Sequence, residues 1–123
     1  MALAARKIGP HARLALKSLD RTRRIFGLES KTETGAIFGI SRQALDEWYT
    51  KGVPMSRVAD VGRVASLADA LRARFVPERL PQIVREPLPG LGGESILRAI
   101  RAHGTGAIFD LLDRAFSYIP SYD

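Results

Sequence analysis

The sequence predicts an all-α protein. Apolar residues recur at the three-and-four spacing of helices, no segment alternates apolar and polar residues as a strand does, and Ser, Gly and Pro mark the ends of the periodic segments. The chain has 123 residues, of which 46% are hydrophobic. This is enough to bury a core, either as one compact unit or as two small, closely packed ones.

The first helix is predicted from about Pro10 to Phe26, after a basic N-terminal arm of residues 1–9. Proline suits the first turn of a helix, because its missing N–H would have no partner there, and Gly27 can end the helix. The apolar face of this helix is expected to consist of Leu14, Leu16, Leu19, Ile25 and Phe26.

Two shorter helices are predicted over residues 31–38 and 42–50, joined by a tight turn at Gly39-Ile40. The segment Ser30-Lys-Thr-Glu33 has the capping-box pattern, in which the serine caps the helix and the glutamate returns a hydrogen bond. Ser41 is placed to cap the second of these helices. The pattern therefore predicts a close pair of short helices.

A long fourth helix is predicted from Pro54 to about Phe75, and Val76-Pro77 interrupts it. Its core-facing residues keep helical spacing: Val58, Val61, Val64, Leu67, Leu71 and Phe75. The seam between the two halves of the chain is expected within residues 76–90. The domains are thus predicted as 10–76 and 77–123.

The C-terminal half is predicted to contain a short helical turn over 78–84, an extended Pro87-Leu88-Pro89, and a helix from Glu94 to Ala102 ended by Gly104. A last helix is predicted over 105–118. That helix is expected to bury Ile108, Leu111, Leu112, Ala115 and Phe116.

The net charge of +6 is concentrated at the start of the chain. Residues 1–31 contain eight basic and two acidic residues, whereas the remainder is close to neutral. Such a block favours a polyanionic partner, because binding releases counterions. A solvated helix face is the other interpretation of the same block.

The sequence indicates neither catalysis nor a cofactor or metal site. It has no cysteine, and its two histidines, His11 and His103, lie at predicted helix ends. The Gly-Gly turn at 92–93 is followed by no Gly-Lys-Ser/Thr, which disfavours a nucleotide site. No apolar run approaches the ~20 residues of a membrane span, and a charge interrupts the apolar start, so a cytoplasmic protein is expected.

Residues 30–52 have the features of a helix-turn-helix. Gly35 supplies a small residue where two helices must cross, and Gly39 tolerates positive φ in the turn. The wedge between the helices is expected to be filled by Ile37 or Phe38, Ile40, Leu45 and Trp48. A plain helical hairpin within a bundle is the alternative interpretation.

The start of the second helix of such a pair reaches base edges in the major groove. Arg42 can contact guanine and Gln43 adenine, whereas Asp46 and Glu47 would repel phosphate. Phosphate contacts are expected near Lys31 and Lys51. The predicted DNA-binding residues are Lys31, Ser41, Arg42, Gln43, Glu47 and Lys51.

The order of residues after Arg85 is Pro-x-x-x-x-Gly-Gly-x-Ser-x-Leu-x-Ala-Ile, followed by an apolar helix that ends Asp113-Arg-Ala-Phe-Ser-Tyr118. This segment resembles the toxin-binding domain of the Xre/MbcA/ParS antitoxin family, and the upstream helix-turn-helix resembles the Xre-type module of the same family. The resemblance covers most of residues 30–123 and is strongest over 85–118. The tryptophan that members often carry near the start of this domain is absent from residues 80–84.

The resemblance implies a type II antitoxin: an Xre-like helix-turn-helix bundle followed by a small helical toxin-binding domain. Its partners would be a RES-domain toxin that degrades NAD and the operator DNA of its own operon, bound as a homodimer within a larger toxin–antitoxin complex. The residues assigned to the toxin by this resemblance are Leu91, Gly92, Gly93, Ser95, Arg114, Phe116, Tyr118, Ile119, Tyr122 and Asp123.

The tail after the last helix supports a contact with a partner on physical grounds. It is rich in large apolar side chains, which are favoured interface anchors, and Pro120 stiffens it. Alternatively, Phe116 and Ile119 complete the chain's own core. A stand-alone helix-turn-helix regulator or DNA-binding architectural protein is the second function that the sequence supports.

Overall fold

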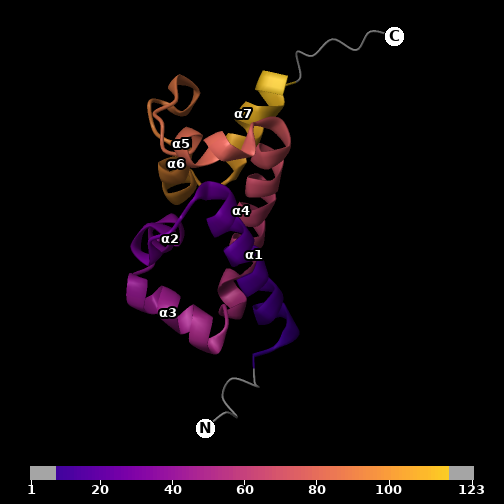
Figure 1. Ribbon diagram of the computed structural model, residues 1–123, viewed down its shortest axis with the longest axis vertical. Helices are drawn as coiled ribbons and strands as arrows, with labels where there is room; N and C mark the ends of the chain where they lie inside the picture. The colour runs from indigo at the N-terminus through magenta and orange to yellow at the C-terminus, as the bar shows by residue number, and fades with distance from the viewer. Residues whose placement is uncertain (1–7, 117–123) are drawn as a thin grey trace, which may run out of the picture.

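The computed structural model describes residues 8–116, and within this range the chain is all-helical, as predicted (Figure 1). No helix in this range is both long and apolar enough to cross a membrane. The elements in order are α1 (Pro10–Phe26), α2 (Lys31–Phe38), α3 (Arg42–Lys51), α4 (Met55–Arg74), the 3-10 turn η2 (Pro77–Arg79), α5 (Leu80–Ile83), the 3-10 turn η3 (Pro89–Leu91), α6 (Ile96–His103) and α7 (Gly106–Phe116).

Serine hydroxyls cap three of the helices. Ser30 Oγ accepts a hydrogen bond from the Glu33 amide at 3.2 Å, and Ser41 Oγ accepts one from the Ala44 amide at 3.1 Å. Ser95 caps α6 in the same way, so this helix begins at Ile96 and not at Glu94 as predicted. Each cap satisfies a backbone donor that has no partner within the first turn.

Helices α1 and α4 lie side by side through the middle of the molecule (Figure 1). The buried stripe of α1 runs through Ala15, Leu19, Thr22 and Phe26, with spacings of four, three and four. The prediction for Leu14 was wrong: its side chain lies off this stripe and is 59% exposed. The inward stripe of α4 agrees with its predicted spacing.

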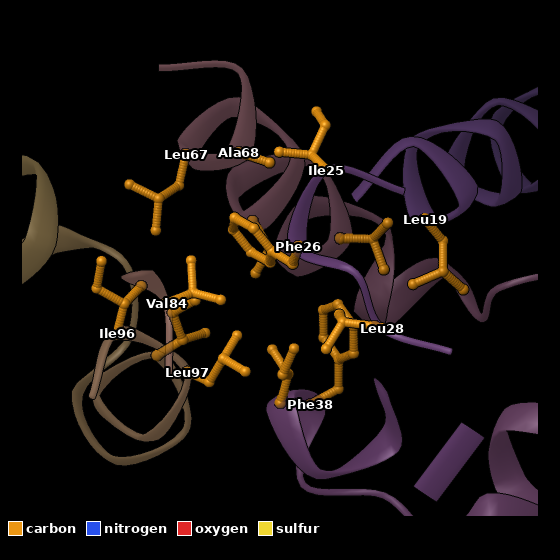
Figure 2. Close-up of a cluster of buried hydrophobic side chains, with 14 of the residues drawn as sticks. Leu19, Ile25, Phe26, Leu28, Phe38, Leu67, Ala68, Val84, Ile96 and Leu97 are labelled. Carbon is orange, nitrogen blue, oxygen red and sulfur yellow. The ribbon is translucent and has the colours of Figure 1, made fainter. Parts of the chain in front are cut away.

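The N-terminal and C-terminal halves of the sequence share one hydrophobic core. Figure 2 shows Phe26, at the end of α1, surrounded by Leu67 of α4, Val84 after α5 and Leu97 of α6. Phe38 of α2 joins the same cluster. Helix α6 therefore packs directly against α2, across the seam at residues 76–90.

Helix α7 completes the core with two of its predicted residues. Ile108 and Leu112 are buried, and Leu111 is half-buried. The prediction for Ala115 was wrong, because the helix extends beyond the core at this point and Ala115 is exposed. Residues 117–123 lie outside the described residues, and so does the Phe116 side chain.

The Arg85 side chain joins the two halves by hydrogen bonds. Its Nε and Nη2 atoms donate to the two carboxylate oxygens of Glu33 at 3.0 and 2.7 Å. Its Nη1 and Nη2 atoms also donate to the carbonyls of Phe26 and Gly27 at 2.9 and 3.0 Å. The carboxylate of Glu33, which the sequence assigns to a capping box, thus pairs with an arginine 52 residues away.

Candidate functional site

The helix pair α2–α3 depends on two glycines. A Cβ atom on Gly35 would lie 2.7 Å from the carbonyl oxygen of Ile40, so no larger residue fits without moving the backbone. Gly39 has φ +69°, the left-handed conformation that glycine adopts without strain. Both predicted roles are confirmed, and together they set the close approach of α2 to the start of α3.

Aromatic and aliphatic side chains fill the wedge between the two helices. Ile37, Phe38, Leu45 and Trp48 are buried, and Ile40 is half-buried. The ring centroids of Phe38 and Trp48 lie 5.5 Å apart, and the two ring planes are tilted by 56°. This tilted arrangement is favourable for aromatic pairs. The wedge therefore packs one face of α3 into the core and leaves the opposite face exposed.

The predicted DNA-binding residues of α3 all lie on that outer face. Arg42 and Gln43 in its first turn are exposed. Glu47 and Lys51 follow Gln43 at intervals of four residues and are also exposed. The Ser41 hydroxyl is already engaged as the helix cap. The first turn of α3 thus presents one guanidinium and one amide to solvent.

Lys31 is paired with an acidic residue of α3. Its Nζ lies 2.6 Å from Asp46 Oδ1, and both side chains are a little over two-fifths exposed. The hydrogen bond from Lys31 is the main cause that lowers the pKa of the Asp46 carboxyl below 3.8, and the charges of Lys31 and Arg42 add to it. The pair joins α2 to α3 and offsets the negative charge of Asp46.

Sequence reasoning missed a network that fixes α3 against α1. The Tyr49 hydroxyl accepts a hydrogen bond from Arg23 Nη1 and donates one to Asp20 Oδ1, both at 3.0 Å. Burial is the main cause that raises the pKa of Tyr49 above 10.0. Arg23 also donates to the carbonyls of Leu28 and Glu29. No local pattern signals this network, because Tyr49 lies 26 residues after Arg23 and 29 residues after Asp20.

The turn before α6 is built from backbone hydrogen bonds and glycines. Gly92 and Gly93 both have positive φ, and the Gly93 amide donates to the Leu88 carbonyl at 2.9 Å. A Cβ on Gly90 would lie 2.8 Å from Leu111 Cδ1, so the turn packs closely on α7. The turn before α6 therefore also contacts α7, the helix that follows α6.

The residues assigned to a toxin by resemblance fall in the turn before α6, in the last part of α7 and outside the described residues. Leu91, Gly92, Gly93 and Ser95 lie together in the turn before α6, and Arg114 is exposed near the end of α7. Phe116 ends α7. The others lie outside the described residues: Tyr118, Ile119, Tyr122 and Asp123.

Residues 8–116 contain no group of three or more His, Cys, Asp or Glu side chains placed to hold a metal ion. His103 Nε2, at the end of α6, lies 3.4 Å from Oε1 of Glu94, which lies in the turn before the same helix. Comparison of the sequence with protein-family models gave no match, and neither curated proteins nor solved structures gave one.

Proposed function

We propose that this chain is a type II antitoxin. It binds and blocks a RES-domain toxin that degrades NAD, and as a homodimer it represses its own operon by binding operator DNA. The observation that carries the proposal is the order of parts in one chain: a helix pair with the spacing of a helix-turn-helix, then the Pro-x-x-x-x-Gly-Gly-x-Ser turn, then two short apolar helices and an aromatic tail.

The geometry of α2 and α3 supports DNA binding. The first turn of α3 carries Arg42 and Gln43 in exposed positions, and these side chains suit guanine and adenine in the major groove. The Lys31 pair reduces the repulsion that Asp46 would exert on a phosphate. Lys51 adds an exposed cation at the other end of α3.

The arrangement of the two ends supports simultaneous binding of two partners. Helices α3 and α7 lie at opposite ends of the long axis of the molecule (Figure 1). A toxin at α7 and the tail therefore leaves the outer face of α3 accessible to DNA. The aromatic residues of the tail have the chemistry of interface anchors.

The proposal is tested by co-expressing the chain with the toxin frame adjacent to it and purifying one through a tag on the other. The full chain is expected to co-purify with the toxin, and deletion of residues 119–123 is expected to release toxin activity. Arg42→Ala is the matched control, because it alters the proposed DNA-reading face and leaves the tail intact. Failure of the full chain to co-purify would contradict the proposal.

A stand-alone transcriptional regulator is the second candidate, and the charges on α1 favour it. Arg13, Lys17 and Arg24 are exposed along this helix. This function predicts strong, salt-sensitive DNA binding without any protein partner. Arg24→Ala would then weaken binding to all sequences, whereas Arg42→Ala would relax sequence preference. Tight operator binding combined with no co-purifying toxin would favour this candidate.

A further inference from the structure

A cleft lies where the C-terminal half meets the α2–α3 helix pair. It has a volume of about 220 Å³, several times the ~30 Å³ share of one water molecule. Its walls come from the end of α2, the first half of α4 and the junction between α6 and α7. Three arginines line it, together with a single acidic residue: Arg57, Arg63, Arg101 and Asp60.

Asp60 holds two of these arginines in place. Its Oδ2 accepts a hydrogen bond from Arg57 Nη1 at 3.3 Å, and its Oδ1 accepts one from Arg63 Nη2. Each guanidinium has five N–H donors, so each keeps most of its donors for another acceptor. The carboxylate therefore positions the two side chains without using up their capacity to bind an anion.

Arg101 reaches the same cleft from α6, on the other side. Its guanidinium carbon lies 2.8 Å from the point where a Cβ of Gly39 would be, so a side chain at residue 39 would displace the guanidinium from its present position. Among residues 8–116, Arg101 has no hydrogen-bond or ion-pair partner. A guanidinium whose donors have no acceptor among residues 8–116 thus lies against the turn between α2 and α3.

We propose that Arg57, Arg63 and Arg101 form a phosphate-binding site at this turn. The three guanidinium groups and one carboxylate give the lining a formal charge of +2. The planar fork of arginine matches the oxygens of a phosphate and binds them in pairs. Because two of the arginines come from α4 and one from α6, the site exists only when the two halves of the chain are packed together.

The phosphate has two possible sources with the same chemistry: the DNA backbone and free phosphate. The site adjoins Gly39, two residues before the cap of α3, so a backbone phosphate is the expected ligand. That assignment rests on the proposed DNA-binding function. It makes the C-terminal half a contributor to DNA affinity, through Arg101.

The DNA arm of the test measures binding of a fluorescein-labelled duplex from the region upstream of the reading frame, by anisotropy at several salt concentrations. Arg101→Gln is expected to weaken binding about tenfold, the loss of one charge-assisted hydrogen bond, and to reduce the salt slope by about one. Arg63→Gln is expected to act similarly. Arg98→Gln is the matched control, since Arg98 is exposed on the same helix and does not line the cleft.

The second arm titrates inorganic phosphate, with chloride at equal ionic strength as the control, and follows the NMR signals of the Gly39 amide and the Arg101 Nε–H. A saturable shift that Arg101→Gln abolishes supports the site even if no DNA binds, in which case the DNA-binding proposal alone fails. A loss of DNA affinity without such a shift identifies the DNA backbone as the ligand. The site is overturned if neither readout depends on Arg101.

Discussion

The absence of a side chain at Gly35 sets how closely α2 approaches the turn before α3. In Gly35→Ala the new methyl group would meet the carbonyl oxygens of Ile40 at 2.7 Å and Ser41 at 3.3 Å. We expect the free energy of unfolding to fall by about 1–3 kcal/mol, as in other overpacked sites. Urea denaturation followed by the fluorescence of Trp48, the only tryptophan, measures this change.

Gly62 offers the matched control for the same substitution. It lies exposed within α4, and a Cβ there would meet no atom within 4 Å. Gly62→Ala is therefore expected to raise the free energy of unfolding by about 0.5–1 kcal/mol, through helix propensity alone. If both substitutions raised the free energy of unfolding, the inference that the Ile40 carbonyl leaves no room for a side chain at residue 35 would be wrong.

The Tyr49 hydroxyl connects α3 to α1 by hydrogen bonds. Tyr49→Phe removes the hydrogen bonds of this hydroxyl with Arg23 and Asp20. We expect the free energy of unfolding at neutral pH to fall by about 1 kcal/mol. Because the folded pKa is raised above 10.0, the unfolded chain loses the phenolic proton first as the pH rises. The stabilisation is thus complete below pH 10 and is lost above it.

Denaturation of the wild type and Tyr49→Phe in parallel, at neutral pH and above pH 10, tests this dependence. The difference in their free energies of unfolding is expected to shrink at the higher pH, since only the wild type has the Tyr49 proton to lose. A difference that stayed constant would mean that the hydroxyl is not held in the folded state.

At the scale of the elements, the Arg85 side chain connects the end of α1, the start of α2 and the segment after α5. Arg85→Gln removes a two-point contact with Glu33, whose side chain is 38% exposed against 34% for Arg85. We expect the free energy of unfolding to fall by about 1–2 kcal/mol. This is less than the loss of a buried pair would cause, because both side chains are partly exposed. Thermal or urea unfolding measures it.

Arg98→Gln again serves as the control, because Arg98 is exposed on α6 and is expected to change stability by less than about 0.5 kcal/mol. Arg85→Lys keeps the charge and loses the planar fork, so it is expected to restore only part of the stability. Equal effects of Arg85→Gln and Arg98→Gln would show that the contact with Glu33 contributes nothing.

The ends of the elements were largely predictable from the sequence because their causes are local. Ser30 and Ser41 cap the helices that follow them, and Gly27 and Gly39 end helices with positive φ. The pairing of elements was less predictable. A helical period shows which residues share a face, but it does not show what covers that face, so Leu14 was wrongly assigned to the core.

In the whole molecule, the contacts across the seam at residues 76–90 could not have been predicted from the sequence. Arg85 pairs with Glu33, and Arg101 lies against Gly39. Neither contact has a spacing that a pattern could reveal, since each depends on how α6 packs on α2. The placement of Arg42 and Gln43 in the first turn of α3 was predictable, because both residues directly follow a capping serine. The cleft lined by Arg57, Arg63 and Arg101 was not.

The central claim is that the whole chain neutralises a toxin that degrades NAD, and the most direct test measures cellular NAD. The adjacent toxin frame would be induced alone, with this chain, and with this chain lacking residues 119–123. We expect NAD to collapse with the toxin alone, to stay normal with the full chain, and to collapse again with the shortened one. NAD that is unaffected by the toxin frame, or that falls equally with and without the full chain, would contradict the account.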